Sequence, residues 1–245
     1  MSGQNSMVRR SEARTAVVWN VLRAVLPASS TASVVDIGGG TGGLAVRIAE
    51  LGHRVTVIDP SPDALAALGR RADESGVADL VTGEQGDLGT LHDLVPAGTA
   101  DLVLCHGVLE IVDDPAAALG SIAQALRPGG TLSLLVNQRH AAVVARAMAG
   151  HFVQARALLD DPNPTATGGG ARRFTAEEVT ALLADAGFGA GSMHAVRVFV
   201  DLVPSSLVDL EPGAAAALVE LEQAVADRPE YFPLATQLHA LATRR

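Results

Sequence analysis

The sequence predicts an α/β fold built on a doubly wound parallel sheet, and three observations carry that prediction. Strand-like apolar segments alternate with helix-like segments five times between residues 33 and 136. Several of these strand-like segments end at a polar residue that is followed by a turn. Two turns contain Ser61-Pro62 and Asp114-Pro115, which are typical helix starts because Ser and Asp cap the helix and proline fits its first position. This alternation implies parallel strands with helices on both faces of the sheet.

The expected elements follow from the apolar periodicity and the turn residues. Strands are expected at 34–37, 54–59, 80–82 and 101–104, with a fifth introduced by residues 126–132. The helices of this region are expected at 41–50, 61–75 and 115–126, after a loose tail at 1–6 and an amphipathic helix at 7–26.

The pattern changes after the fifth strand. Thr175 and Glu178 form a capping box, which predicts a helix that ends near Gly187. The other expected elements are a helix at 138–159, a mobile Pro/Gly-rich loop at 160–173, a sixth strand at 196–202, a helix at 214–227 and a seventh, antiparallel strand at 236–243.

Composition excludes several classes of protein. The chain has 245 residues and a net charge of −9, and all 18 of its basic residues are arginine. Without lysine there is neither a Walker-type phosphate loop nor a Schiff-base mechanism. One cysteine cannot form an intrachain disulfide, and no Cys/His set has zinc-ligand spacing, so no metal is expected. We find neither a signal peptide nor an apolar run of membrane-spanning length, so we expect a cytoplasmic protein without a membrane partner.

A glycine-rich turn follows the first strand and predicts a ligand site. Gly38-x-Gly40-x-x-Gly43 matches the dinucleotide fingerprint, and Asp36-x-Gly38-x-Gly40-x-Gly42 matches the S-adenosylmethionine (SAM) loop equally well. Both interpretations expect an acid at the end of the next strand to hold ribose hydroxyls, and Asp59 supplies it. A tight turn without a ligand is the third possibility.

Later motifs decide between these ligands. Gly86-Asp87-Leu88 follows the third strand, Cys105-His106-Gly107 follows the fourth, and Leu126-Arg127-Pro128-Gly129-Gly130 introduces the fifth. In this order and spacing the chain resembles the class I SAM-dependent methyltransferases. The resemblance implies a seven-stranded, Rossmann-like sheet with a helical lid, SAM as the cofactor and S-adenosyl-L-homocysteine as the product.

The resemblance also implies which residues bind SAM. Asp36 would lie beside the amino end of the methionine moiety, Asp59 would accept from both ribose hydroxyls, and Asp87 would accept from the adenine amino group. The Leu88 amide would donate to a ring nitrogen. The full predicted set is Asp36, Gly38, Gly40, Gly42, Asp59, Pro60, Asp87, Leu88 and His106.

The expected domain organisation has four parts. Residues 1–30 form an N-terminal helix or lid, and 31–136 form the SAM-binding α/β core. Residues 137–175 form a helical lid with a mobile loop, and 176–245 complete the sheet.

A closer resemblance runs from Arg14 to the C-terminus. Segments 14–19, 140–152 and 196–201 are similar to the bacterial tRNA 5-carboxymethoxyuridine methyltransferases, which methylate a carboxylate on a modified wobble uridine. If this carries over, Arg14 and Arg197 position the substrate carboxylate, since a guanidinium can pair with both oxygens. His106, His140 and Tyr231 are further pocket candidates, and no residue is assigned as a general base.

Two other functions stay open beside methylation of tRNA. The first is O-methylation of a small metabolite or natural product. An acidic chain with only 3% aromatic residues lacks the basic, aromatic surface that stacks unpaired bases, which favours this alternative. The second is a non-catalytic protein that binds SAM or S-adenosyl-L-homocysteine. The partner is therefore tRNA or a small-molecule acceptor, and the sequence does not give an oligomeric state.

Overall fold

The computed structural model describes residues 2–160, 171–189, 191–204, 207–208 and 213–245. The chain divides into two compact units. The first unit comprises Met1–Val25, Val136–Glu178 and Ser192–His239, and the second comprises Leu26–Leu135, Val179–Gly191 and Ala240–Arg245. The long strands β5 (Leu126–Asn137) and β8 (Gln237–Arg244) each contribute residues to both units.

The sheet has the strand order β3-β2-β1-β4-β5-β8-β6, and β7 also pairs with β8. The remaining strands are β1 (Ser33–Ile37), β2 (Arg54–Asp59), β3 (Val81–Gln85), β4 (Ala100–His106), β6 (Phe188–Gly189) and β7 (Met193–Val196). The first five strands pair in parallel, whereas β6 and β8 are antiparallel. The order reverses at β1, between β2 and β4, so a crevice opens there at the carboxyl ends of the strands. The predicted doubly wound α/β sheet with an antiparallel last strand is confirmed.

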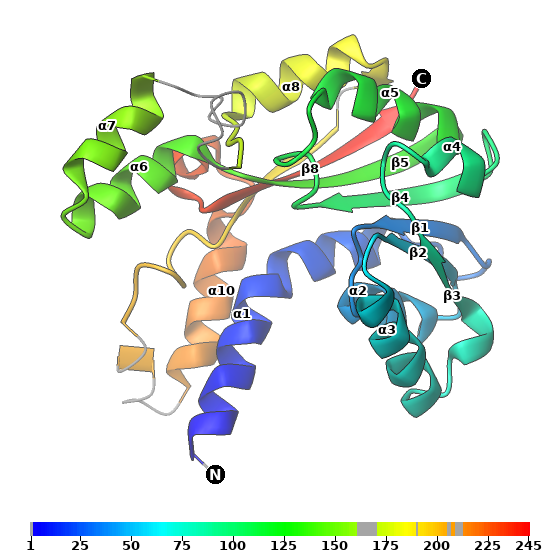
Figure 1. Ribbon diagram of the computed structural model, residues 1–245. Coiled ribbons are helices and arrows are strands. Elements are labelled where there is room, and N and C mark those ends of the chain that lie inside the picture. Colours follow the sequence, from blue (N-terminus) through cyan, green and yellow to red (C-terminus); the bar gives the residue numbers. More distant parts are fainter. Residues whose placement is uncertain (1, 161–170, 190, 205–206, 209–212) are drawn as a thin grey trace. The chain divides into compact units, whose positions relative to one another are not determined.

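Helices cover both faces of the sheet in the second unit (Figure 1). Helices α2 (Gly43–Ala49) and α3 (Pro62–Glu74) lie on one face, and α4 (Leu91–Leu94) and α5 (Pro115–Ala125) lie on the other. Apolar residues fill β1 and β4, as parallel strands covered on both faces require. A short 3₁₀ helix, η1 (Ala78–Leu80), precedes β3.

Both predicted proline-containing helix starts are confirmed. The Ser61 hydroxyl accepts from the Ala64 amide at 3.3 Å at the start of α3. The Asp114 carboxylate accepts from the amides of Ala116 and Ala117 at 2.9 and 3.0 Å at the start of α5. These contacts satisfy amides that the first turn of a helix leaves unpaired.

The capping box of α8 (Ala176–Asp185) is also confirmed. The Thr175 amide donates to the Glu178 carboxylate at 2.8 Å, and the Glu178 amide donates to the Thr175 hydroxyl at 3.3 Å. Glu178 also pairs with Arg139 at 2.6 Å. Glu178 therefore caps α8 and also stabilises the start of a second helix, which begins at Arg139.

The first unit is mainly helical. It contains α1 (Ser2–Val25), α6 (Arg139–Met148), α7 (Phe152–Asp160), α10 (Ala214–Val225) and the 3₁₀ helix η3 (Pro229–Leu234). Helix α1 lies along α10 (Figure 1). Ala195, Val198, Val225 and Ala235 form a buried cluster, against which Tyr231 and two phenylalanines pack.

Two predictions about helices are wrong. The predicted helix at 138–159 is two helices, because the chain leaves α6 and adopts a left-handed conformation at Gly150, with φ of 78°. The predicted loose tail is helical from Ser2, since no proline interrupts α1 in this stretch. Most of the predicted mobile loop, residues 161–170, lies outside the described residues.

The predicted sixth strand at 196–202 is also wrong. Strand β7 ends at Val196, and residues 197–203 form bends and turns. Arg197 has φ of +61°, which an extended strand cannot contain. The amides of residues 198–200 donate to a side chain rather than to a neighbouring strand.

Among the described residues, no helix has the length and apolar character that crossing a membrane requires.

Replacing Leu104 with alanine should destabilise the sheet. Leu104 lies in β4 and is 0% exposed, so the change removes apolar contacts and leaves a cavity. We expect a loss of about 2–5 kcal/mol in the free energy of unfolding, measured by urea denaturation. Leu51→Ala is the matched control because Leu51 is 45% exposed, and it should cost less than about 1 kcal/mol. Equal losses in the two variants would contradict this assignment of the core.

Candidate functional site

The glycine-rich turn after β1 has a backbone conformation that residues with side chains could not adopt without strain or clashes. Gly38, Gly40 and Gly42 have positive φ angles of 69°, 56° and 76°, which L-residues rarely adopt. A Cβ on Gly39 would come within 2.5 Å of the Asp36 Oδ2 atom. The Gly38 amide donates to the Ile58 carbonyl at 2.8 Å, so the turn is held against the end of β2. The backbone of this turn therefore has the geometry that the predicted ligand-binding turn requires.

Two carboxylates lie at the ends of the neighbouring strands. Asp36 on β1 is 4% exposed and Asp59 on β2 is 8% exposed. Burial, and secondly the nearby Asp59 charge, raise the pKa of Asp36 from 3.8 to about 7. Asp59 accepts from the Gly40 amide through Oδ2 and from the Ser61 amide through Oδ1, both at 2.9 Å. Because each oxygen has two lone pairs, Asp59 can hold both turns and still accept from a ligand hydroxyl.

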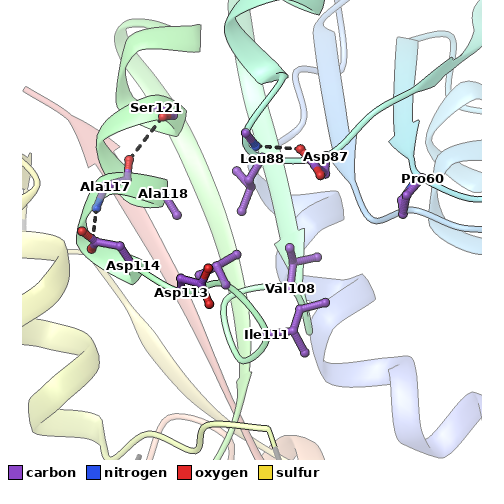
Figure 2. A pocket seen from close by; sticks show the side chains of 12 residues that line it. Pro60, Asp87, Leu88, Val108, Ile111, Asp113, Asp114, Ala117, Ala118 and Ser121 are labelled. Carbon is purple, nitrogen blue, oxygen red and sulfur yellow. Dashed lines mark hydrogen bonds between the residues drawn. The ribbon is translucent and has the colours of Figure 1, made fainter. Parts of the chain in front are cut away.

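A cavity of about 490 Å³ opens beside the turn after β2, and none of residues 36–43 lines it. Figure 2 shows its lining, which comes from the segments after β2, β3 and β4 and from α5. Pro60, Asp87 and Leu88, three of the predicted site residues, line it. Its volume lies within the range of small-molecule sites, roughly 300–1,000 Å³. The structure therefore brings these three residues together around a space of suitable size.

Asp87 has a structural task as well. Its Oδ1 atom accepts from the amides of Gly89 and Thr90 at 2.8 and 3.2 Å. These bonds fold the segment between β3 and α4 back on itself, so that Leu88 is buried while Asp87 is exposed. The cavity thus has an apolar wall beside a fixed carboxylate.

Sequence reasoning missed the other side of the cavity. The missed lining residues are Gly89, Val108, Ile111, Val112, Asp113, Asp114, Ala117, Ala118 and Ser121. They lie mainly between β4 and the second turn of α5, where the sequence shows a short apolar stretch but no chemical motif. Ile111 is 70% exposed despite its apolar side chain, a property that only the structure shows.

His106 is the last residue of β4, because the strand extends two residues beyond its predicted end at Leu104. Its Nε2 atom lies 2.8 Å from the Ser133 hydroxyl on β5. Burial lowers the pKa of His106 to about 4, so its imidazole is neutral at pH 7. A histidine with this pKa is a weak general base at neutral pH.

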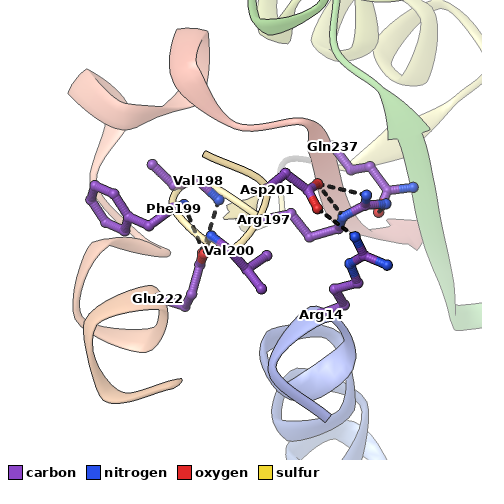
Figure 3. A network of polar contacts seen from close by, with 8 residues as sticks. All are labelled: Arg14, Arg197, Val198, Phe199, Val200, Asp201, Glu222 and Gln237. Atoms are coloured by element: carbon purple, nitrogen blue, oxygen red, sulfur yellow. Dashed lines mark hydrogen bonds and ion pairs between the residues drawn. The ribbon is translucent and has the colours of Figure 1, made fainter. Parts of the chain in front are cut away.

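Arg14 and Arg197, which are 183 residues apart in the sequence, meet around one carboxylate in the first unit (Figure 3). Arg14 Nη2 donates to Asp201 Oδ1 at 2.9 Å. Arg197 Nε and Nη2 lie 2.7 and 2.6 Å from Asp201 Oδ2. Two guanidinium groups and one carboxylate carry a net charge of +1, so the cluster suits one further anionic group. Asp201 was missed in the sequence prediction.

The other two pocket candidates also belong to the first unit. Tyr231 on η3 is half-buried and packs its ring edge-on against Phe199, with centroids 6.1 Å apart. His140 on α6 is exposed, and its Nδ1 atom lies 3.2 Å from Gln138 Nε2. The first unit therefore holds Arg14, Arg197, Tyr231 and His140, whereas His106 belongs to the second.

Comparison with known proteins identifies the family. A methyltransferase domain family matches residues 35–132. The tRNA 5-carboxymethoxyuridine methyltransferase of Escherichia coli K12 is 30% identical over 240 residues, which cover 96% of this chain and 89% of that protein. The chain belongs to the SAM-dependent methyltransferases. A ubiquinone biosynthesis O-methyltransferase of Xanthomonas axonopodis pv. citri is 38% identical to this methyltransferase over 128 residues, 52% of either chain.

Solved structures confirm the fold of this methyltransferase. A Thermotoga maritima SAM-dependent methyltransferase, described as a possible histamine N-methyltransferase, superposes with a TM-score of 0.62. Its sequence identity is 19%, and the match covers 99% of this chain and 94% of that one. A Streptomyces coelicolor geranyl diphosphate C-methyltransferase, solved with S-adenosyl-L-homocysteine, gives a TM-score of 0.62 at 16% identity, over 94% of this chain and 79% of that one.

The chemistry of the second unit suits SAM. The turn is open at Gly40, where a Cβ would meet only the Asp59 Oδ2 atom at 3.9 Å, so a ligand can approach the backbone there. The buried Asp36 carboxylate would gain a favourable charge partner from a cationic amino group. Asp59 presents two oxygens at the strand end, as a pair of ribose hydroxyls requires. The apolar wall of the cavity suits a flat ring.

The raised pKa of Asp36 predicts how the ligand-free protein responds to pH. Between about pH 4 and about pH 7 the folded protein keeps a proton that the unfolded chain has lost, so stability falls as pH rises through this window. A shift from 3.8 to about 7 corresponds to about 4 kcal/mol over the whole window, of which about 2–3 kcal/mol is lost between about pH 5 and about pH 7.5. Asp36→Asn should remove this loss, measured by urea denaturation at about pH 5 and about pH 7.5.

The control for this measurement is Asp73→Asn, because Asp73 is an exposed acid on α3. It should keep the pH dependence of the wild-type protein. If Asp36→Asn also kept that dependence, the assignment of the titration to Asp36 would be wrong.

Proposed function

We propose that the second unit of this methyltransferase binds SAM across the turn after β1 and in the neighbouring cavity. Asp36 faces the amino end of the methionine moiety, and the backbone of residues 38–42 lies along it. Asp59 accepts from the ribose hydroxyls. Asp87 and the Leu88 amide bind the edge of the adenine ring, which packs beside Pro60, and His106 lies close to the sulfonium. The buried carboxylates, the glycine turn and the lining of the cavity support these roles.

The proposed acceptor is a carboxylate on a modified wobble uridine of tRNA. The observation that carries this proposal is the 30% identity to the Escherichia coli enzyme over 96% of this chain. The meeting of Arg14 and Arg197 supports it, because the guanidinium N–H groups that do not bond Asp201 can donate to the oxygens of a further carboxylate. The net charge of +1 on their cluster with Asp201 suits an acceptor group with one negative charge.

The chemistry needs no strong base. SAM supplies a methyl group already activated by a positive sulfur. A carboxylate oxygen attacks the methyl carbon in line, the carbon–sulfur bond breaks, and its electron pair goes to sulfur, which leaves a methyl ester and S-adenosyl-L-homocysteine. A carboxylic acid with a pKa of about 4 is already ionised at pH 7. The low pKa of His106 is compatible with this scheme, in which positioning can supply about 7–11 kcal/mol.

A small-molecule O-methyltransferase is the second candidate. The 38% identity to a ubiquinone biosynthesis O-methyltransferase over 128 residues favours it, as does a net charge of −9, which opposes a broad nucleic-acid interface. The distinguishing experiment incubates the purified protein with SAM and tRNA that carries 5-carboxymethoxyuridine, followed by mass spectrometry of the nucleosides. Formation of the methyl ester supports the tRNA assignment, and its absence together with methylation of small acids supports the alternative.

Arg14→Gln tests the role of the guanidinium pair. The change removes one charge-assisted hydrogen-bond donor, which is worth about 1.5–3 kcal/mol, so we expect the KM for the modified tRNA to rise about 10–100-fold. The affinity for SAM should not change, because Arg14 belongs to the first unit. Both constants can be measured, by steady-state kinetics and by calorimetry.

Arg23→Gln is the matched control, since Arg23 is an exposed arginine on the same helix. It removes the same charge without touching the Asp201 cluster. If the two variants raised KM equally, the effect would come from net charge, and Arg14 would have no specific role.

A further inference from the structure

A buried glutamate on α10 gathers three consecutive backbone amides. Glu222 is 1% exposed. Its Oε2 atom accepts from the Val198 amide at 2.9 Å, and its Oε1 atom accepts from the amides of Phe199 and Val200 at 2.8 and 2.7 Å. Figure 3 shows these amides turned toward Glu222 from the loop after β7. Consecutive amides that converge on one anion form a backbone nest.

The energetics explain why this glutamate holds the loop firmly. A carboxylate buried without partners costs several kcal/mol. Three charge-assisted hydrogen bonds offset that cost, and the same bonds satisfy three amides that have left the sheet. Glu222 and the loop therefore depend on each other, since opening the loop would leave a buried charge unpaired.

The loop holds Arg197 in a strained conformation. Among the described residues, Arg197 is the one non-glycine residue with a positive φ, at 61°. Such a conformation is unfavourable for a residue with a side chain and persists only where the surroundings impose it. The nest begins at the next residue, and the Arg197 carbonyl accepts from the Thr236 amide at 3.2 Å. The peptide unit that follows Arg197 is thus held at its carbonyl by Thr236 and at its amide by Glu222.

The same loop also positions Asp201. Asp201 follows the nest directly, and its carboxylate joins Arg197 to Arg14. Arg197 Nη1 also lies 3.5 Å from Gln237 Oε1, at the limit of a hydrogen bond. The relative placement of the two guanidinium groups therefore depends on the loop between residues 197 and 201, and that loop depends on Glu222.

We propose that Glu222 is a positioning residue for acceptor recognition. It acts through the amides of residues 198–200, which set the strained backbone of Arg197 and the place of Asp201, and so fix the guanidinium pair that receives an acceptor carboxylate. This inference rests on the proposed function for the identity of the acceptor. The link between Glu222 and Arg197 can be measured without any acceptor.

The kinetic test compares Glu222→Gln with Glu220→Gln. The first keeps the shape of the side chain but removes the charge that three amides share, and the second changes an exposed glutamate on the same helix. We expect Glu222→Gln to raise the KM for the modified tRNA about tenfold, with kcat and SAM affinity within about twofold of wild type. Glu220→Gln should leave all three unchanged.

A double-mutant cycle separates positioning from general destabilisation. If Glu222 acts through Arg197, then Glu222→Gln should raise KM clearly less in an Arg197→Gln background than in the wild-type background. An equal effect in both backgrounds would overturn the proposal, and so would an unchanged KM in the single variant. Glu222→Asp keeps the charge on a shorter side chain and is the second variant if Glu222→Gln fails to fold. It should give an intermediate KM.

A measurement without acceptor keeps the two proposals distinct. The Nε–H signal of Arg197 in a ¹⁵N NMR spectrum reports its hydrogen bond to Asp201, and Arg197→Lys identifies the signal by its loss. This signal should move in Glu222→Gln and stay in place in Glu220→Gln. If it stayed in place in both, the positioning role would be wrong. If it moved while wild-type protein failed to methylate the tRNA, the proposed acceptor would be wrong and the positioning role would stand.

Discussion

The hydrogen bonds of the Asp59 carboxylate are the contacts on which the proposed SAM site of this methyltransferase depends. It joins the turn after β1 to the turn after β2 through the amides of Gly40 and Ser61. Its charge also helps to raise the pKa of Asp36, so one side chain sets both the shape and the electrostatics of the site. Because these turns lie where the strand order reverses, their position fixes where a ligand can lie above the sheet.

The two units differ in how far they stabilise the charge of a buried carboxylate. Glu222 in the first unit receives three amides, and its charge is used inside the fold to hold the loop that follows β7. Asp36 in the second unit has a pKa raised to about 7, so the fold alone does not stabilise its charge. We infer that the charge of Glu222 is stabilised by the protein itself, whereas the charge of Asp36 is stabilised by the cationic end of its ligand.

The sequence predicted what local chemistry determines. The ends of β1 and β2 and the helix starts at Ser61 and Asp114 follow from apolar periodicity and capping, which act within a few residues. The loop after β7 was mistaken for a strand because its conformation depends on Glu222, a residue on a later helix. The family resemblance indicated Arg14 and Arg197. No local sequence pattern indicated Asp201, the carboxylate that both arginines contact. The cavity wall after β4 was missed because its residues match no known binding motif.

The most direct test of the account is the number of protons released when the protein binds S-adenosyl-L-homocysteine at about pH 6, where a free α-amino group is already protonated. Calorimetry in buffers of different ionisation enthalpy measures it. With a pKa of about 7, Asp36 is mostly protonated before binding, and a cationic amino group beside it should expel that proton. We predict a release close to one proton per ligand, lost in Asp36→Asn. Binding without proton release, or the same release in Asp36→Asn, would contradict the placement of the ligand beside Asp36.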